Sequence, residues 1–304
     1  MQKHYRPIFS KLLRSSYRDV KGICSIDSKQ EGPCVGITIC THGNEPCGLA
    51  IAQYILAGSL QLKRGKIIIV MNNPAACQKY FNAQTEKEKQ NARFIDINMN
   101  RLPVDLKNPD FKDLYEVKRA LELLPIWQEF DYAIDIHSTT QPSEAMIIEG
   151  EKDASEFTIK MNVPIVIRNM VPVQVGAPAI SFYDENSICF GLEAGSHETE
   201  EAQNVAVDCT INLLHQLDML SISYNAKMVQ QSIYTVENSI LFPDNTYVLS
   251  REFPMFGNVY KGEIIASGQG EDITSSIDGC TIMAPKGLTP YNIKEEVLFI
   301  CHKS

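Results

Sequence analysis

Short apolar runs of strand length alternate along this chain with longer segments of helical spacing, and this alternation limits the fold more than any other feature. Residues 35–41 (VGITICT) and 66–71 (KIIIVM) have the nearly continuous apolar character of strands buried on both faces. Residues 111–130 instead place apolar side chains on one helical face, namely Leu114, Val117, Leu121 and Leu124. Further strands are expected at 132–136, 145–148, 163–167 and 188–194, and further helices at 48–60, 75–81 and 200–220. The pattern predicts an α/β sandwich around a mixed or mostly parallel central sheet.

The pattern of apolar and turn-forming residues changes after residue 222. From there on, short apolar pieces alternate with turn signals such as Pro243-Asp244-Asn245 and Gly268-Gln269-Gly270. We therefore expect a catalytic α/β domain over residues 1–222 and a small β-rich C-terminal domain over residues 223–304. Within the first domain, the polar stretch 82–91 (NAQTEKEKQN) is expected to be an exposed loop.

Composition narrows the classes of function. The 304 residues carry a net charge of -9 with a sequence pI of about 5.2, which argues against nucleic acid as a partner. The nine cysteines are odd in number and include no C-x-x-C pair, which favours a reducing, cytoplasmic setting over a disulfide framework. The chain shows no signal-peptide pattern and no apolar run of membrane length, so we expect no membrane partner. The oligomeric state stays open, and a homo-oligomer is compatible with the sequence.

Residues with metal-binding chemistry stand at the ends of two predicted strands. His42 and Glu45 follow strand 35–41, and His137 follows strand 132–136. Because ligands gather beyond the carboxyl ends of parallel strands, these side chains meet if the two strands are neighbours. Two imidazoles and a carboxylate suit zinc and leave a position for a water, whose pKa the metal lowers to about 7. Gly43 is expected to let the backbone turn sharply, so that Glu45 folds back toward His42.

Each of these motifs is short. A lone histidine after a strand is usually a hydrogen-bonded structural residue, but a pair at two strand ends favours a metal site. Asp135 lies two residues before His137, so on a strand both side chains point to the same side. We interpret Asp135 as a residue that orients an imidazole ligand.

Two further groups of residues supply functions that a metal site alone lacks. Arg93, Asn100 and Arg101 stand within nine residues, a set that suits a carboxylate or an oxyanion; ordinary solvated arginines are the alternative. Glu193 lies in an apolar, glycine-flanked strand, where burial raises the pKa of a carboxyl group and suits it to proton transfer. A structural salt bridge is the alternative for Glu193.

Taken in order, these residues resemble the succinylglutamate desuccinylase and aspartoacylase family, relatives of the zinc carboxypeptidases. The shared pattern is His42-x-x-Glu45, Asn100-Arg101, Asp135-x-His137 and Gly191-Leu192-Glu193, and it extends over about residues 33–198. The resemblance implies a carboxypeptidase-like α/β/α sandwich with a mixed sheet, and the β-rich tail fits the family's C-terminal domain. The family usually has a glycine two residues before the first histidine, where this chain has Cys40.

The resemblance also implies roles for the catalytic residues. It assigns one zinc ion per chain to His42, Glu45 and His137. It makes Glu193 the base that activates water and passes its proton to the leaving amine. It makes Arg93 the group that polarises the scissile carbonyl.

For the substrate, the resemblance implies that Asn100 and Arg101 bind a carboxylate and that Tyr291 reaches the site from the C-terminal domain. Aspartoacylases carry a second substrate-binding arginine ten residues before the catalytic glutamate, and this chain has Tyr183 there. Arg168 lies further upstream and is a candidate substitute that no motif in the sequence supports. The departure weakens the case for N-acetylaspartate, and succinylglutamate gains nothing from it.

The function expected from the sequence is that of a zinc-dependent amidohydrolase. It would cleave a small-molecule N-acyl amino acid, of the N-acetylaspartate or N-succinylglutamate kind, to a carboxylate and a free amino acid. A zinc carboxypeptidase that acts on peptides needs the same zinc, base and carboxylate anchor, and it stays an alternative. A non-catalytic homologue that keeps the metal is the third hypothesis.

Overall fold

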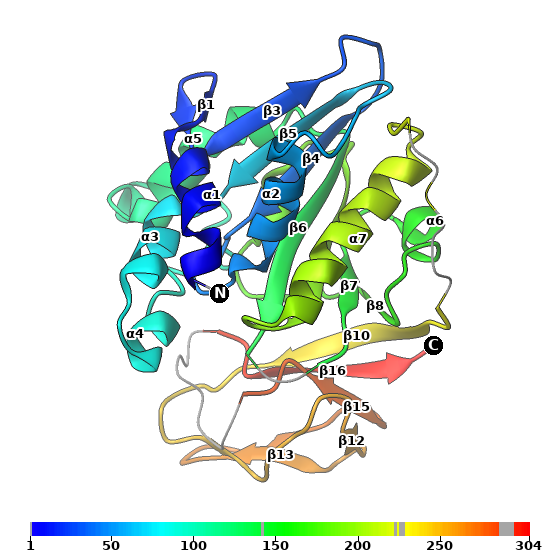
Figure 1. Ribbon diagram of the computed structural model, residues 1–304. Helices are drawn as coiled ribbons and strands as arrows, with labels where there is room; N and C mark the ends of the chain where they lie inside the picture. The colour runs from blue at the N-terminus through cyan, green and yellow to red at the C-terminus, as the bar shows by residue number, and fades with distance from the viewer. Residues whose placement is uncertain (1, 141–142, 222–223, 225–228, 286–294) are drawn as a thin grey trace.

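One mixed sheet organises the molecule (Figure 1), a computed structural model that describes residues 2–140, 143–221, 224, 229–285 and 295–304. In the described residues this sheet has eleven strands. From one edge to the other they are β12 (Asn258–Val259), β15 (Gly279–Ile282), β16 (Leu298–Lys303), β10 (Ser232–Ile240), β8 (Ile165–Arg168), β7 (Met146–Glu149), β9 (Ile188–Ser196), β6 (Tyr132–Thr139), β4 (Cys34–Ile39), β5 (Lys66–Met71) and β3 (Ile23–Asp27). Strands β5, β4, β6 and β9 run parallel to one another, whereas β7 is antiparallel to β9. The predicted α/β architecture with a mixed central sheet is confirmed.

Helices cover both faces of the sheet. One face carries α1 (Gln2–Arg14), α2 (Leu49–Leu56), α3 (Pro74–Asn82) and α7 (Glu200–Gln216), and the other carries α5 (Tyr115–Trp127). Strand β5 shows why: Ile67 and Ile69 belong to the first core, while Ile68 and Val70 belong to the second. Successive side chains of a strand point to opposite faces, so a continuously apolar strand needs a helical layer on each side.

Two local expectations were wrong. Residues 86–90 of the supposed loop form the short helix α4 (Glu86–Gln90), because Thr85 and Glu88 close a capping box across its first turn. In α5 the buried face is turned relative to the prediction: Val117 is buried together with Ala120, Leu123 and Trp127, whereas Leu121 is only partly buried against the same core. Leu114 is the N-cap of that helix and not part of it.

Smaller elements complete the fold. They are the hairpin of β1 (Ser16–Tyr17) and β2 (Val20–Lys21), the helix α6 (Ser155–Thr158), and the 3-10 turns η1 (Pro46–Gly48), η2 (Pro109–Phe111), η3 (Val171–Val173) and η4 (Ala179–Phe182). No helix in the described part of the chain combines the length and the apolar character needed to cross a membrane.

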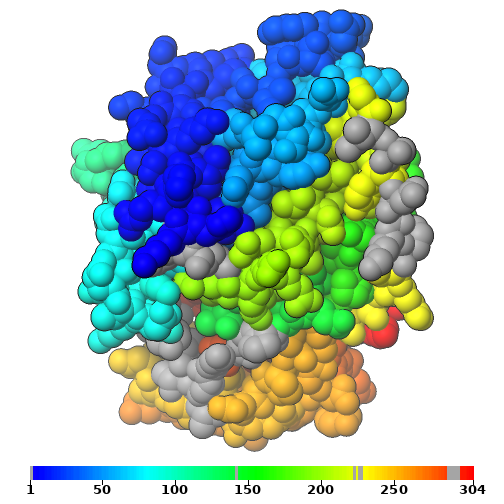
Figure 2. Space-filling model, in the orientation of Figure 1, coloured from blue at the N-terminus to red at the C-terminus, as the bar shows by residue number. Residues whose placement is uncertain are grey.

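The C-terminal region is rich in strands. A second sheet of β11 (Val248–Leu249), β13 (Ile264–Ser267) and β14 (Ile273–Thr274) packs its own apolar cluster. Figure 2 shows this region, in orange, at one end of the molecule, beyond the helices that cover the main sheet. Strand β10 nevertheless pairs in parallel with β8, so the main sheet continues into the C-terminal region. The domain boundary after residue 222 stays a prediction, and residues 222–223 lie outside the described part.

Candidate active site

The candidate site lies where three parallel strands end. Strands β4, β6 and β9 are neighbours in the sheet, which is the condition that the sequence argument required. His42 follows β4 by three residues, while His137 stands inside β6, because that strand runs on to Thr139. Glu193 of β9 lies directly opposite His137 in the register of the two parallel strands. His42, His137 and Glu193 are therefore brought together at the carboxyl ends of these central strands.

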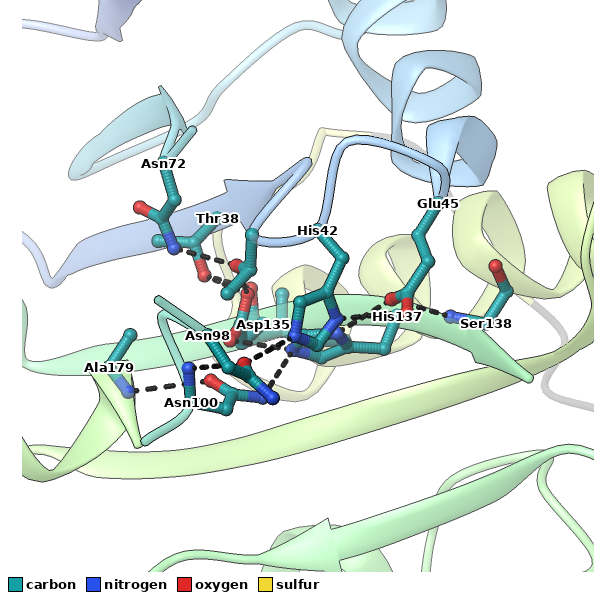
Figure 3. A network of polar contacts seen from close by, with 12 residues as sticks. Thr38, His42, Glu45, Asn72, Asn98, Asn100, Asp135, His137, Ser138 and Ala179 are labelled. Atoms are coloured by element: carbon teal, nitrogen blue, oxygen red, sulfur yellow. Dashed lines mark hydrogen bonds and ion pairs between the residues drawn. The ribbon is translucent and has the colours of Figure 1, made fainter. Parts of the chain in front are cut away.

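His42, Glu45 and His137 form a buried cluster in which one carboxylate bridges two imidazoles (Figure 3). The Nδ1 atoms of His42 and His137 lie 2.8 Å from Glu45 Oε1 and Oε2 respectively. One potential ligand atom from each residue lies within 4.8 Å of the others. In the described part of the chain, this is the one group of three or more His, Cys, Asp or Glu residues with metal-ligand spacing.

The opposite nitrogen of each imidazole is held by a second residue (Figure 3). His42 Nε2 lies 2.8 Å from Asn98 Oδ1, and His137 Nε2 lies 2.9 Å from Asp135 Oδ2. Both partners are oxygen acceptors, so each Nε2 carries the proton and each Nδ1 turns its lone pair toward Glu45. Three electron-rich atoms then converge, and only a cation or a proton between them makes that arrangement favourable. The donor set therefore fits a divalent metal of the zinc type.

The pKa shifts of the three residues indicate which proton a bound metal ion would displace. Burial, followed by the charge of Arg93, lowers the pKa of His42 and keeps that imidazole neutral. Burial alone would lower the pKa of His137, but the carboxylates of Asp135 and Glu45 raise it well above its usual value. Burial has the opposite effect on a carboxyl group and would raise the pKa of Glu45. The two imidazoles, with His42 contributing most, instead hold that pKa well below its usual range. A metal ion would take the place of the extra proton on His137.

A buried network of hydroxyl and amide groups holds Asp135 (Figure 3). Its Oδ1 accepts hydrogen bonds from Thr38 Oγ1 at 2.7 Å and from Thr41 Oγ1 at 2.8 Å. Asn72 Nδ2 in turn donates to Thr41 Oγ1 at 2.8 Å. The carboxylate that orients His137 is thus held on both oxygens, as expected for a residue that sets a ligand's direction.

The role of Gly43 differs from the expectation. Its backbone is not left-handed; the left-handed residue is Cys40, with a φ of 53°. An added Cβ at Gly43 would lie 2.2 Å from the Ala76 carbonyl carbon and 2.3 Å from the Ala92 oxygen. Gly43 N also donates to Arg93 O at 2.9 Å. Glycine is required here because the metal loop packs against two other backbone segments.

Replacing Gly43 with alanine is therefore expected to destabilise the fold by about 1–3 kcal/mol, because backbone atoms rather than flexible side chains must move. The midpoint of urea denaturation measures the effect. Gly191→Ala is the matched control, because a Cβ there meets only Ile148 Cβ, at an ordinary 3.7 Å. Equal midpoints for the two variants would contradict the close-packing argument.

Glu193 has the environment of a proton carrier. Its side chain is half-buried, but Oε2 is enclosed and has no hydrogen-bond partner among the described residues. Burial raises the pKa of Glu193 to about 7; Glu45 and Asp135 add to the rise, while His137 and Arg93 oppose it. A carboxyl group of this kind changes protonation near neutral pH and is free to accept a proton.

Arg93 and Asn100 lie beside the cluster. Arg93 Nη1 forms an ion pair with Glu45 Oε1 at 2.7 Å, with its guanidinium partly exposed. Asn100 Nδ2 lies 3.4 Å from His137 Nε2, and its Oδ1 accepts a long hydrogen bond from Ala179 N at 3.5 Å. Arg93 thus contacts the carboxylate of the cluster directly, whereas Asn100 contacts His137 at the nitrogen that faces Asp135.

Arg101 is engaged by a distant residue of the chain, because it forms a partly buried ion pair with Glu296. Tyr291 lies outside the described residues. Tyr183 is buried, with its hydroxyl 3.0 Å from Thr38 Oγ1, so it belongs to the support under Asp135. Its ring packs against Trp127 and Phe130, with centroids 5.6 and 5.3 Å away.

Arg168 cannot replace the missing arginine. It is paired with Glu149, whose Oε2 lies 3.1 Å from Arg168 Nε. Glu149 stands opposite Phe190 in the sheet, three residues before Glu193 on β9. That separation corresponds to about 10 Å along the strand, away from the end where the cluster lies.

Sequence reasoning missed the residues that support the ligands. Asn98 holds His42, although it carries no motif of its own beside Asn100. Thr38 and Thr41 belong to the apolar run 35–41, which predicts only a strand. Their signal was present, because a hydroxyl in a buried strand needs a polar partner.

Comparison with known proteins identifies the family of this chain. Residues 31–209 match the family described as "Succinylglutamate desuccinylase/Aspartoacylase catalytic domain". An N-acyl-aromatic-L-amino acid amidohydrolase (carboxylate-forming) of Rattus norvegicus is 35% identical over 143 residues, covering 42% of this chain and 40% of the rat protein. An aspartoacylase of Danio rerio is 24% identical over 246 residues, covering 73% of this chain and 74% of the fish protein.

The likeness in fold extends further than the likeness in sequence. The crystal structure of succinylglutamate desuccinylase from Vibrio cholerae superposes with a TM-score of 0.70 and covers 92% of this chain and 85% of the other, at 14% identity. The family match spans more than half of the chain, and its range includes His42, Glu45, His137 and Glu193. The chain therefore belongs to the succinylglutamate desuccinylase/aspartoacylase family.

Proposed function

We propose that this protein is a zinc-dependent amidohydrolase that cleaves N-acyl amino acids to a carboxylate and a free amino acid. One observation carries the proposal: Glu193 stands in register with His137 of the His42–Glu45–His137 cluster, and its Oε2 has no hydrogen-bond partner among the described residues. A set of metal-binding residues beside a carboxyl group of near-neutral pKa is suited to the hydrolysis of an unactivated amide.

Each residue of the site would have a distinct role in the reaction. The triad would hold zinc, which when bound supplies a Lewis acid for the carbonyl and lowers the pKa of the attacking water. Glu193 takes a proton from that water and delivers it to the leaving amine. Arg93, at 2.7 Å from Glu45, is close enough to stabilise negative charge on the carbonyl oxygen. Asn100 and Arg101 hold the substrate carboxylate.

The arrangement of cations favours an uncharged amino-acid side chain in the substrate. Tyr183 is buried in the core, and Arg168 is engaged by Glu149, so neither offers a second positive charge to an acidic side chain. The rat relative is named for aromatic N-acyl amino acids. We therefore propose that acyl derivatives of neutral, aromatic amino acids are preferred over N-acetylaspartate and N-succinylglutamate.

A substrate panel tests this function. Purified protein with zinc is incubated with N-acetyl-L-phenylalanine, N-acetyl-L-aspartate, N-succinyl-L-glutamate and a dipeptide that ends in phenylalanine, and released amine is measured. We expect the highest kcat/KM for N-acetyl-L-phenylalanine. Faster cleavage of the dipeptide would favour a carboxypeptidase, and absence of turnover with metal bound would favour a non-catalytic homologue.

A further inference from the structure

Arg101 is engaged by a carboxylate of the chain itself. Nε and Nη2 of Arg101 both lie 2.5 Å from Glu296 Oε2, and Nη1 donates to the Asn100 carbonyl oxygen at 2.7 Å. The two residues are 195 positions apart, and Glu296 stands just before β16 in the C-terminal region. The side chain of Glu296 is fully buried, while 17% of the Arg101 side chain is exposed.

Glu296 is fixed in place by more than this ion pair. Its Oε1 accepts a hydrogen bond from the backbone N–H of Val175. The loop that contains Val175 is joined to the Arg101 segment by a pair of backbone hydrogen bonds, Leu102 N to Ala177 O at 3.0 Å and Ala177 N to Leu102 O at 2.9 Å. A substrate carboxylate that displaced Glu296 would leave a buried charge without its donors, which is strongly unfavourable.

The geometry of a guanidinium decides what remains for a substrate. Arginine has five N–H donors in a planar fork. Glu296 takes the side edge formed by Nε and Nη2, and Asn100 takes one N–H of Nη1. Among the described residues, these contacts leave one N–H on Nη1 and one on Nη2. Nη1 and Nη2 form the outer edge of the guanidinium, which matches the two oxygens of a single carboxylate.

We propose that Glu296 is a positioning residue for substrate recognition: it locks the side edge of Arg101, so that the outer edge is presented to the α-carboxylate of the substrate. This inference rests on the proposed function, because it takes Arg101 as the carboxylate anchor of an N-acyl amino acid. It places a determinant of substrate affinity in the C-terminal region, outside the residues that match the family description.

The test compares Glu296→Gln with a matched control, Glu263→Gln. Glu263 has the same pattern of partners in the same region: Oε1 accepts from Arg251 Nε at 3.0 Å and Nη2 at 2.8 Å, and Oε2 accepts from Tyr260 N at 2.9 Å. Each zinc-loaded variant is assayed with N-acetyl-L-phenylalanine and with its carboxamide, which offers no carboxylate to Arg101.

For Glu296→Gln we expect KM for N-acetyl-L-phenylalanine to rise about tenfold, the scale of one charge-assisted hydrogen bond, with kcat within about twofold of the parent value. Turnover of the carboxamide is expected to be unchanged, which also shows that the variant is folded. Glu263→Gln should match the parent protein on both substrates. A fall in KM would show instead that Glu296 competes with substrate, and an equal loss on both substrates would show a purely structural role; either result overturns the proposal.

A binding measurement separates this inference from the proposed function. If the parent protein cleaves neither compound, the proposed function fails, and calorimetric titration with N-acetyl-L-phenylalanine decides the role of Glu296. Weaker binding by Glu296→Gln than by the parent and Glu263→Gln would support positioning. Equal affinity in all three proteins, or no binding by the parent, would overturn it.

Discussion

The Glu193→Gln protein is expected to lose about 10²–10⁴ in kcat, the usual contribution of a positioned general base, while it keeps its fold and its metal. Glutamine has the shape of glutamate but cannot take up a proton, and Oε2 has no hydrogen-bond partner among the described residues whose loss would disturb the structure. Steady-state kinetics, metal analysis and circular dichroism measure the three quantities. Glu198→Gln is the control, because Glu198 follows the same strand but pairs with Lys89 at 3.3 Å. Activity within threefold of the parent would remove Glu193 from the mechanism.

Glu193 should also determine how kcat/KM of the parent protein falls at acidic pH. Burial raises the pKa of Glu193 to about 7, and only the ionised form accepts a proton, so kcat/KM rises with pH through this region. Below the pKa, activity falls tenfold for each pH unit. A cation held by the triad favours the ionised carboxylate, so this fall lies at or below pH 7 in the metal-loaded protein. The residual activity of Glu193→Gln should lack this fall.

Replacing Glu45 with glutamine is expected to reduce the bound metal from about one ion per chain to almost none, with activity lost in proportion. Glu45 is the residue on which both histidines converge, and a neutral amide neither balances the charge of the ion nor bridges the two imidazoles equally. Metal content after dialysis, measured by elemental analysis, gives the result.

A graded comparison sharpens this expectation. Asp135→Asn should weaken metal affinity only about 10- to 100-fold, because Asp135 acts on His137 and not on the ion. Full metal content in the Glu45→Gln protein would exclude the His42–Glu45–His137 triad as the site.

Features that depend on local sequence could be predicted. The apolar runs at β4, β5 and β6 mark strands whatever the rest of the fold, and residues at their carboxyl ends must gather where those strands are neighbours. Helix α1 is harder to predict: Tyr5, Ile8, Phe9 and Leu12 bury one helical face, but Pro7 inside the segment argues against a helix.

Contacts between distant segments could not be predicted in the same way. The hydrogen bond from Tyr183 to Thr38 joins residues 145 positions apart, and a tyrosine at that position reads equally well as a pocket residue or as core. Whether Arg101 faces water, substrate or another side chain depends on where the C-terminal region packs. Pairing rules for strands do not give that position, so the role of Glu296 becomes visible only in the folded chain.

The parallel pairing of β10 with β8 has a practical consequence for recombinant work. The matched segment 31–209 ends before β10, and a gene fragment trimmed to it would leave β8 as a bare edge strand with unpaired backbone groups. Such an edge is a template for aggregation. Chimeras between relatives would therefore need their crossover outside this strand pair. The C-terminal region is hydrogen-bonded to the main sheet through β10 and cannot be exchanged as an independent unit.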